Sequence, residues 1–403
     1  MDKPKHHVIF LGAGASASSG YPLGNGLRLM LSSKNRLLSS LRNERSELAT
    51  GSVHSYVDGF ASAMSLFREG GFTTVDEFSK LSSDKNASHP REMKKLVQLA
   101  LGLHNPEDTF ENSDYYGFIQ CLFEPGELNT LRKDITILSY NYDIYLDYLL
   151  LRAFKRRQTI ANIQPNAVLW PNKLTSGFFK MDDTAWTKDT AGFNYFKLHG
   201  SIGYALGICE YPHGLFFENP AKARIERLVG ADAKAVIPPI AFPWEIFDSD
   251  GNFISESDFV FLNDPSELIK RNGASLYNLY KKIWEGARNA VQKATKISFV
   301  GLSAHPYMQS GLNYLFKGKN STAEMVVANK ENERWTDAPN IFLPATLCGR
   351  IAAQLQDAGY SQKFRRSWAD FSEQKHATPG IKIHDNPDMT LRYSFEEFIR
   401  TEM

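Results

Sequence analysis

Residues 8–16, Val-Ile-Phe-Leu-Gly-Ala-Gly-Ala-Ser, decide the fold class of this chain. The run Val8–Leu11 is entirely apolar, which is typical of a parallel strand that is buried on both faces. The glycines after it indicate a turn into a short helix, which Gly20 and Pro22 end. A strand, a glycine-rich turn and a helix in this order predict the start of an α/β fold with a parallel sheet.

Two later segments repeat this pattern of an apolar run that ends in polar residues. Ile135–Leu138 precedes Asn141 and Asp143, and Phe196–Leu198 precedes His199. In an open parallel sheet, ligands bind outside the carboxyl ends of the strands. The sequence therefore predicts that three distant segments converge on one site, which combines a phosphate-binding loop, an Asn/Asp pair and a histidine.

The stretch 25–130 is expected to be mainly helical. Five apolar residues recur at steps of three and four and so share one helix face: Val53, Val57, Phe60, Met64 and Phe67. Thr74–Glu77 fits a capping box that opens another helix, and further helices are expected at 91–103 and 113–123. We expect this stretch to be a helical insertion that covers the mouth of the sheet.

Helices and short strands alternate in the second half of the chain. The expected elements are a helix after Asp143 that ends in the basic run 152–157, a helix at 277–294, strands at 297–301 and 325–328, and a final helix at 394–401. Cations suit a helix C-terminus, so the basic run favours a helix end over a nucleic-acid patch. The alternation is typical of βαβ units, and residues 335–403 are expected to lie outside the sheet.

The composition is that of an ordinary globular protein. The chain has 403 residues and a formal net charge of +1, which argues against a general nucleic-acid or membrane binder. Cys121, Cys209 and Cys348 lie far apart, so we expect no metal site and no disulfide framework, and a cytoplasmic location fits. No apolar run reaches the roughly 18 residues of a membrane helix.

Each motif also has a purely structural explanation. Residues 12–17 fit the dinucleotide-binding fingerprint, but a tight turn needs glycines in any case. No acidic residue follows about 20 positions later, which excludes the dehydrogenase version. Asn141 and Asp143 are favoured residues at a helix start, and a single histidine such as His199 is often structural.

Together, however, the motifs resemble those of the sirtuin-type superfamily, which consumes NAD. Five segments carry the resemblance in the family's order: Gly12–Ser16 with Gly20–Pro22 (cofactor loop), Asn141-x-Asp143, Leu198–Gly200 (histidine motif), Gly301–Ser303 and Val327–Asn329. The resemblance implies a Rossmann-like parallel sheet of sirtuin type from residues 1–24 and 131–335. It leaves residues 25–130 as a helical insertion and 336–403 as a C-terminal extension for assembly or partner contact.

Three departures separate the chain from sirtuin deacylases. Leu23–Asn25 replaces their Asp-Phe-Arg, Tyr140 replaces their Gln, and their four zinc cysteines are missing. The chain is therefore more similar to the bacterial sirtuin-like branch that hydrolyses NAD in defence against phages. This resemblance implies that NAD is the substrate, that the chain forms a homo-oligomer, and that a partner such as a HerA-type ATPase regulates it. No direct contact with nucleic acid or membrane is expected.

The resemblance implies two catalytic residues, Asn141 and His199. The other implied NAD-binding residues are Gly12, Ala13, Gly14, Ser16, Pro22, Asp143, Gly301, Ser303 and Asn329. Two alternatives to an NAD glycohydrolase remain open. One is a deacylase or ADP-ribosyltransferase, and the other is a non-catalytic scaffold that senses NAD or ADP-ribose.

Overall fold

The computed structural model describes most of the sheet and the helices around it. The described residues are 6–44, 51–83, 88–102, 104, 114–125, 132–146, 149, 174–175, 178–179, 194–202, 215–216, 240–263, 276–302, 305–319, 323–328, 351, 354–355, 357, 389–392 and 395–403. The basic run at 152–157 lies outside them, as do two predicted site residues, Ser303 and Asn329.

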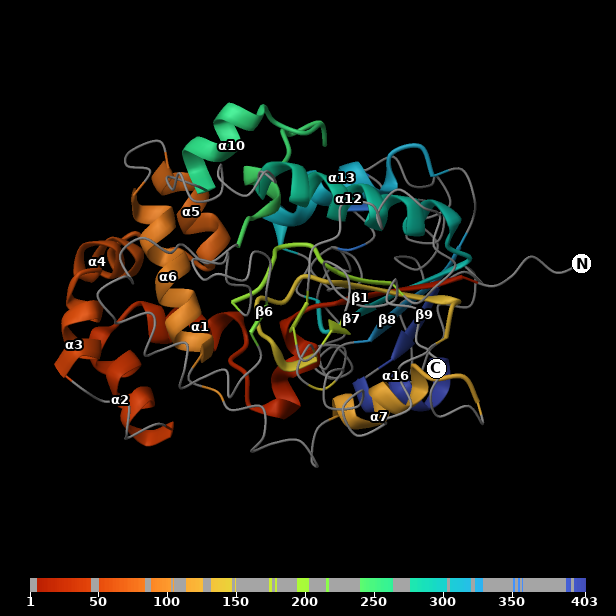
Figure 1. Cartoon of the computed structure of the whole chain (residues 1–403), viewed down its shortest axis with the longest axis horizontal. Helices are drawn as coiled ribbons and strands as arrows, with labels where there is room; N and C mark the ends of the chain where they lie inside the picture. The colour runs from red at the N-terminus through yellow and green to blue at the C-terminus, as the bar shows by residue number, and fades with distance from the viewer. Residues whose placement is uncertain are drawn as a thin grey trace, which may run out of the picture.

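Six strands form one parallel sheet (Figure 1). In spatial order they are β5 (Asn194–Lys197), β2 (Ile135–Ser139), β1 (His7–Leu11), β7 (Lys296–Val300), β8 (Glu324–Ala328) and β9 (Met389–Arg392). Every neighbouring pair is parallel. This is the doubly wound order 3-2-1-4-5-6, in which the chain reverses its direction across the sheet between β1 and β7. The predicted α/β fold with a Rossmann-like parallel sheet is confirmed.

A smaller antiparallel sheet accompanies the main one. Its strands are β3 (Leu174–Thr175), β4 (Phe178–Phe179) and β6 (Leu215–Phe216), with β4 in the middle.

The central strand β1 is buried because strands flank it on both sides and helices cover both faces. Val8, Ile9, Phe10 and Leu11 have no exposed surface. The ring of Phe10 stacks on that of Phe299 in β7, with 4.8 Å between the ring centroids. Burial of one such side chain stabilises the folded state by about 1.5–3 kcal/mol. A run of four apolar residues therefore favours a central strand that is buried on both faces.

Two pairs of helices cover the faces of the sheet (Figure 1). On one face lie α12 (Leu276–Lys293) and α13 (Gln309–Phe316), and on the other lie α7 (Asp114–Cys121) and α16 (Phe395–Glu402). The helices predicted at 113–123, 277–294 and 394–401 are confirmed, with small differences at their ends. No helix among the described residues combines the length and the apolar character needed to cross a membrane.

The end of the chain belongs to the sheet. Strand β9 pairs in parallel with β8 from Met325↔Met389 to Ala328↔Arg392, and α16 packs against both strands. The expectation that residues 335–403 lie outside the sheet is therefore wrong for residues 389–392. Strand β9 lies at the edge of the sheet and pairs with β8 only. An edge strand does not need a fully apolar sequence, so the polar composition of this stretch did not predict it.

Helices α1–α7 all lie in the connection between the adjacent strands β1 and β2. The first six are α1 (Gly24–Leu31), α2 (Lys34–Glu44), α3 (Gly51–Asp58), α4 (Ala61–Glu69), α5 (Val75–Ser83) and α6 (Ser88–Gly102). They gather at the end of the sheet where the parallel strands finish (Figure 1). We call α1–α6 the helical block.

Two local predictions within the helical block have different outcomes. The predicted single face from Val53 to Phe67 is buried, but it spans two helices, because the chain breaks between Asp58 and Ala61. The predicted capping box is present in altered form. Thr74 Oγ1 accepts the Glu77 amide N–H, whereas the Glu77 carboxylate reaches back to Thr73.

The loops after β1 and β7 approach so closely that their backbones touch. The amide of Gly14 donates to the carbonyl of Gly301 at 2.8 Å. A Cβ at Gly14 would lie 2.7 Å from Gly301 Cα, and a Cβ at Gly301 would lie 2.2 Å from the nitrogen of Ala15. Gly301 also has a φ of +61°, which side chains rarely adopt. The close packing of the two backbones is therefore sufficient to explain why glycine is needed at this crossing.

We expect Gly301→Ala to destabilise the protein by well over the roughly 1–2 kcal/mol that a left-handed alanine costs elsewhere, because its methyl group overlaps backbone atoms. Gly318→Ala is the matched control, since Gly318 has a φ of +78° and open space at the Cβ position. Urea unfolding followed by circular dichroism measures both variants. Equal losses would contradict a packing role for Gly301.

Candidate functional site

Three polar side chains converge where β1 and β2 end. Asn141 Nδ2 donates a hydrogen bond to Ser16 Oγ at 3.1 Å, and Ser16 Oγ donates to Asp143 Oδ2 at 2.9 Å. Ser16 lies in the 3-10 helix η1 (Ala13–Ser19), and the other two follow β2. All three are buried. The pairing of β1 with β2 thus brings together residues more than a hundred positions apart, as the sequence predicts.

Asp143 has a structural role in addition to its contact with Ser16. Its Oδ1 accepts the backbone N–H of Tyr145 at 3.0 Å, which is the geometry of a helix start. The structural explanation for Asp143 is therefore confirmed, while its second oxygen belongs to the cluster with Ser16.

Lys197 is a site residue that the sequence analysis missed. It is buried at the end of β5, and its ammonium group donates to the carbonyl oxygen of Asp143 and to Ser201 Oγ. These contacts tie the loop after β2 to the loop after β5. The signal for it was a lysine within the otherwise apolar run Phe196–Leu198, since a buried charge needs polar partners.

His199 follows β5 and is 3% exposed. Its backbone carbonyl accepts hydrogen bonds from the Tyr280 hydroxyl and the Ala241 amide. Its imidazole makes no hydrogen bond among the described residues: both ring nitrogens are buried without a partner, and so is Asn141 Oδ1. Burial, and to a smaller extent the charge of Lys94, together lower the pKa of His199 to about 3. The imidazole is therefore neutral at physiological pH.

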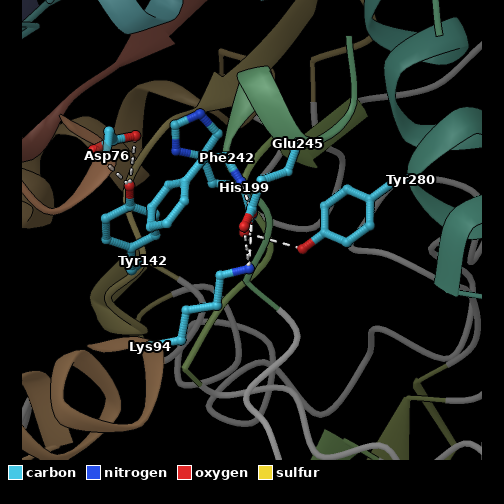
Figure 2. A network of polar contacts seen from close by, with 7 residues as sticks. All are labelled: Asp76, Lys94, Tyr142, His199, Phe242, Glu245 and Tyr280. Carbon is cyan, nitrogen blue, oxygen red and sulfur yellow. Dashed lines mark hydrogen bonds and ion pairs between the residues drawn. The ribbon is translucent and has the colours of Figure 1, made fainter. Parts of the chain in front are cut away.

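A buried ionic network lies beside His199 (Figure 2). Lys94 of α6 donates to both carboxylate oxygens of Glu245, at 2.8 and 2.7 Å, and both side chains are fully buried. The hydroxyl of Tyr142 lies 3.4 Å from each carboxylate oxygen of Asp76 in α5. The sequence analysis named none of these four residues as site residues. A signal existed for Lys94, which shares a helix face with the buried residues Val97 and Leu101.

Most amides of the glycine-rich loop are already engaged. Those of Gly12, Gly14 and Ala15 donate to the carbonyls of Val300, Gly301 and Gly12. In the predicted phosphate-binding loop these three amides are thus engaged within the protein, those of Gly12 and Gly14 at the crossing with β7 and that of Ala15 inside the loop itself. Ala13 is the exposed residue of the loop.

The remaining predicted site residues lie around this crossing. Gly301 touches Gly14 from the β7 side. Pro22 is half-buried and follows η1, beside Tyr21, whose ring packs against Tyr145. No three His, Cys, Asp or Glu side chains in the described segments lie close enough to hold a metal ion.

Comparison with known proteins adds no assignment. No model of a protein family matches this chain, and no curated protein matches it significantly. The function is therefore inferred from the motifs and from the geometry of the site.

Acid is expected to destabilise the fold through His199. The unfolded chain takes up a proton below about pH 6.5, whereas the folded imidazole remains neutral to about pH 3. Stability is therefore lost as the pH falls through this window, by up to about 1.4 kcal/mol per pH unit. His199→Gln should flatten the dependence in urea unfolding between pH 7 and pH 4. His7, also buried with a pKa of about 3, is present in both proteins, and parallel curves would contradict the assignment.

The buried ion pair gives a second prediction. Lys94→Met leaves the Glu245 carboxylate buried without its cation, and we expect a loss of about 3–5 kcal/mol. The double variant K94M/E245Q should lose less than the single one, because it leaves no uncompensated charge and the new side-chain amide can still accept the Phe242 N–H. Thermal and urea unfolding of both variants measure this. A double variant as unstable as the single one would contradict it.

Proposed function

We propose that this chain is an NAD glycohydrolase of the sirtuin-like type, which cleaves NAD with water to nicotinamide and ADP-ribose. NAD is then the substrate, and the reaction needs no further cofactor. Hydrolysis of NAD, which depletes the cell of this cofactor, fits a role in bacterial defence against phages.

One observation carries the proposal. His199 and Asn141 follow adjacent strands, and both ring nitrogens of His199 and Oδ1 of Asn141 are buried without a partner among the described residues. Buried polar atoms are nearly always hydrogen-bonded, so such atoms require an explanation. A ligand with hydroxyl groups, such as the ribose of NAD, would supply the missing partners for both side chains.

The chemistry of NAD suits these two residues. The nicotinamide of NAD is already cationic and leaves as a neutral molecule, so the carboxylic acid that other glycosidases need to protonate the leaving group is unnecessary. The neutral imidazole of His199 can accept a hydrogen bond from water or a sugar hydroxyl. The Asn141 amide can orient the ribose as the oxocarbenium-like centre develops. Such positioning contributes roughly 7–11 kcal/mol to catalysis.

The position of the glycine crossing also supports NAD as the ligand. In doubly wound sheets, dinucleotides lie across the crevice where the strand order reverses. Here that point lies between β1 and β7, at the contact of Gly14 with Gly301. We place the phosphates at the exposed Ala13 edge of the loop and near Ser16.

Regulation by assembly is part of the proposal. Ser16, Asn141, Asp143 and His199 are each at most 6% exposed, which fits a closed site that a homo-oligomer or a HerA-type partner shifts toward an open state. We propose that such a partner acts on the helical block, which lies at the carboxyl ends of the strands (Figure 1).

Purified protein is expected to convert NAD into equal amounts of nicotinamide and ADP-ribose, alone or with its partner present. Asn141→Ala and His199→Gln should each lower the rate by roughly 10²–10⁴-fold, the range that a positioned catalytic group contributes. The control is His54→Gln on α3, which should retain full activity. Chromatography of the nucleotides and circular dichroism of each variant provide the measurements.

Other outcomes would replace the proposal. Full activity in either site variant would remove that residue from the mechanism. Binding of NAD by calorimetry without any turnover would indicate the sensing scaffold, and release of acyl groups from acyl-lysine peptides would indicate a deacylase.

A further inference from the structure

Within the described part of the chain, the imidazole of His199 contacts aromatic rings and makes no hydrogen bond. It stacks on Tyr142, with 5.5 Å between centroids and 24° between planes. Tyr140 and Phe242 meet it edge-on, at 4.9 and 6.3 Å. A catalytic histidine is commonly oriented by a hydrogen bond to its second nitrogen. Because neither nitrogen of His199 has a partner among the described residues, the positions of the rings set its orientation.

Tyr142 is held at both ends. Its hydroxyl donates to the Asp76 carboxylate and lies 3.4 Å from each of the two oxygens. Its backbone carbonyl accepts hydrogen bonds from the Ile202 amide and Ser201 Oγ. The pKa of Asp76 is raised to about 7, chiefly by burial and also by the nearby charge of Glu245. At neutral pH the Asp76 carboxyl group is therefore close to half protonated. The group that faces the Tyr142 hydroxyl thus carries only part of a full negative charge.

Phe242 is held by the ion pair of the same network (Figure 2). Its backbone N–H donates to Glu245 Oε2 at 2.8 Å, and the Lys94 ammonium that binds Glu245 lies 5.3 Å from the centre of the Phe242 ring. Both the lysine and Asp76 come from the helical block. The Tyr142 and Phe242 rings that contact His199 are therefore held by residues that are distant in sequence from the strand before the histidine.

We propose that Asp76 and Lys94 are positioning residues that set the orientation of the His199 ring through Tyr142 and Phe242. The inference rests on the proposed NAD hydrolysis, because the orientation of His199 affects a rate only if His199 acts on the substrate. The helical block then contributes to the reaction itself in addition to covering the strand ends.

The first test observes the His199 ring directly. In the ¹H–¹³C spectrum of imidazole-labelled protein at neutral pH, the His199 signal is assigned by its absence in His199→Gln. Tyr142→Phe, Asp76→Leu and K94M/E245Q should each shift this signal from its position in the unmodified protein. Asp76→Asn keeps an acceptor for the hydroxyl and should leave the signal at that position. The matched controls are Glu77→Gln, next to Asp76 on α5, and Tyr56→Phe, which removes a buried hydroxyl elsewhere. Neither should move it.

The second test separates positioning from folding. For Tyr142→Phe and Asp76→Leu we expect kcat per folded molecule to fall roughly 10- to 100-fold, the cost of misplacing a catalytic group by about 1 Å. KM should stay within a small factor, and Asp76→Asn should recover most of kcat. A merely structural role would lower the unfolding temperature without changing kcat of the folded fraction.

The outcomes distinguish the two proposals. An unmoved His199 signal in both Tyr142→Phe and Asp76→Leu would overturn the positioning role, even with NAD hydrolysis intact. A moved signal in a protein without any NAD hydrolysis would support the contacts and overturn the proposed function instead.

Discussion

The backbone contact between Gly14 and Gly301 is the constraint on which the site depends. It joins the loops after β1 and β7 at the point where the strand order reverses, and it uses amides of the glycine-rich loop for contacts within the protein. A side chain at either glycine would separate the two loops. The 3-10 helix that carries Ser16 would then lose its position over Asn141. The glycines therefore build the crevice first, and any contact with a ligand comes from the residues they position.

Desolvation controls the chemistry of the cluster at the strand ends. Parallel strands that are buried on both faces deliver their following residues into a region with little water, where each polar group needs a partner. Ser16, Asp143 and Lys197 find such partners in the protein. The ring nitrogens of His199 have no such partner among the described residues, and burial keeps the ring neutral. The same physical effect thus favours paired polar groups in one part of the site and an uncharged ring in another.

The helical block is bound to the site by charges that are difficult to separate. Burial raises the pKa of Glu245 and lowers that of Lys94, while each charge offsets the effect of burial on its partner. Such a pair is costly to break on one side only. It therefore fixes α6 against the loop that carries Phe242. Any motion of the block relative to the sheet therefore has to carry this loop with it or break the pair.

The sequence by itself determined five of the six strands of the main sheet and which segments meet at the strand ends. Apolar runs such as Val8–Leu11 predict strands from local composition alone. Because parallel strands finish at one edge, the convergence of Ser16, Asn141 and Asp143 followed from the motifs. Gly20 and Pro22 marked the end of the first helix in the same local way.

Only the tertiary structure decided which distant side chains became partners. Lys94 meets Glu245 across 151 positions, and Tyr142 meets Asp76 across 66. Strand β9 joins the sheet from a polar stretch because an edge position places few demands on composition. The lack of a partner for the His199 ring nitrogens among the described residues is likewise a property of its surroundings. Such features depend on how whole elements pack, and no local pattern of residues records that packing.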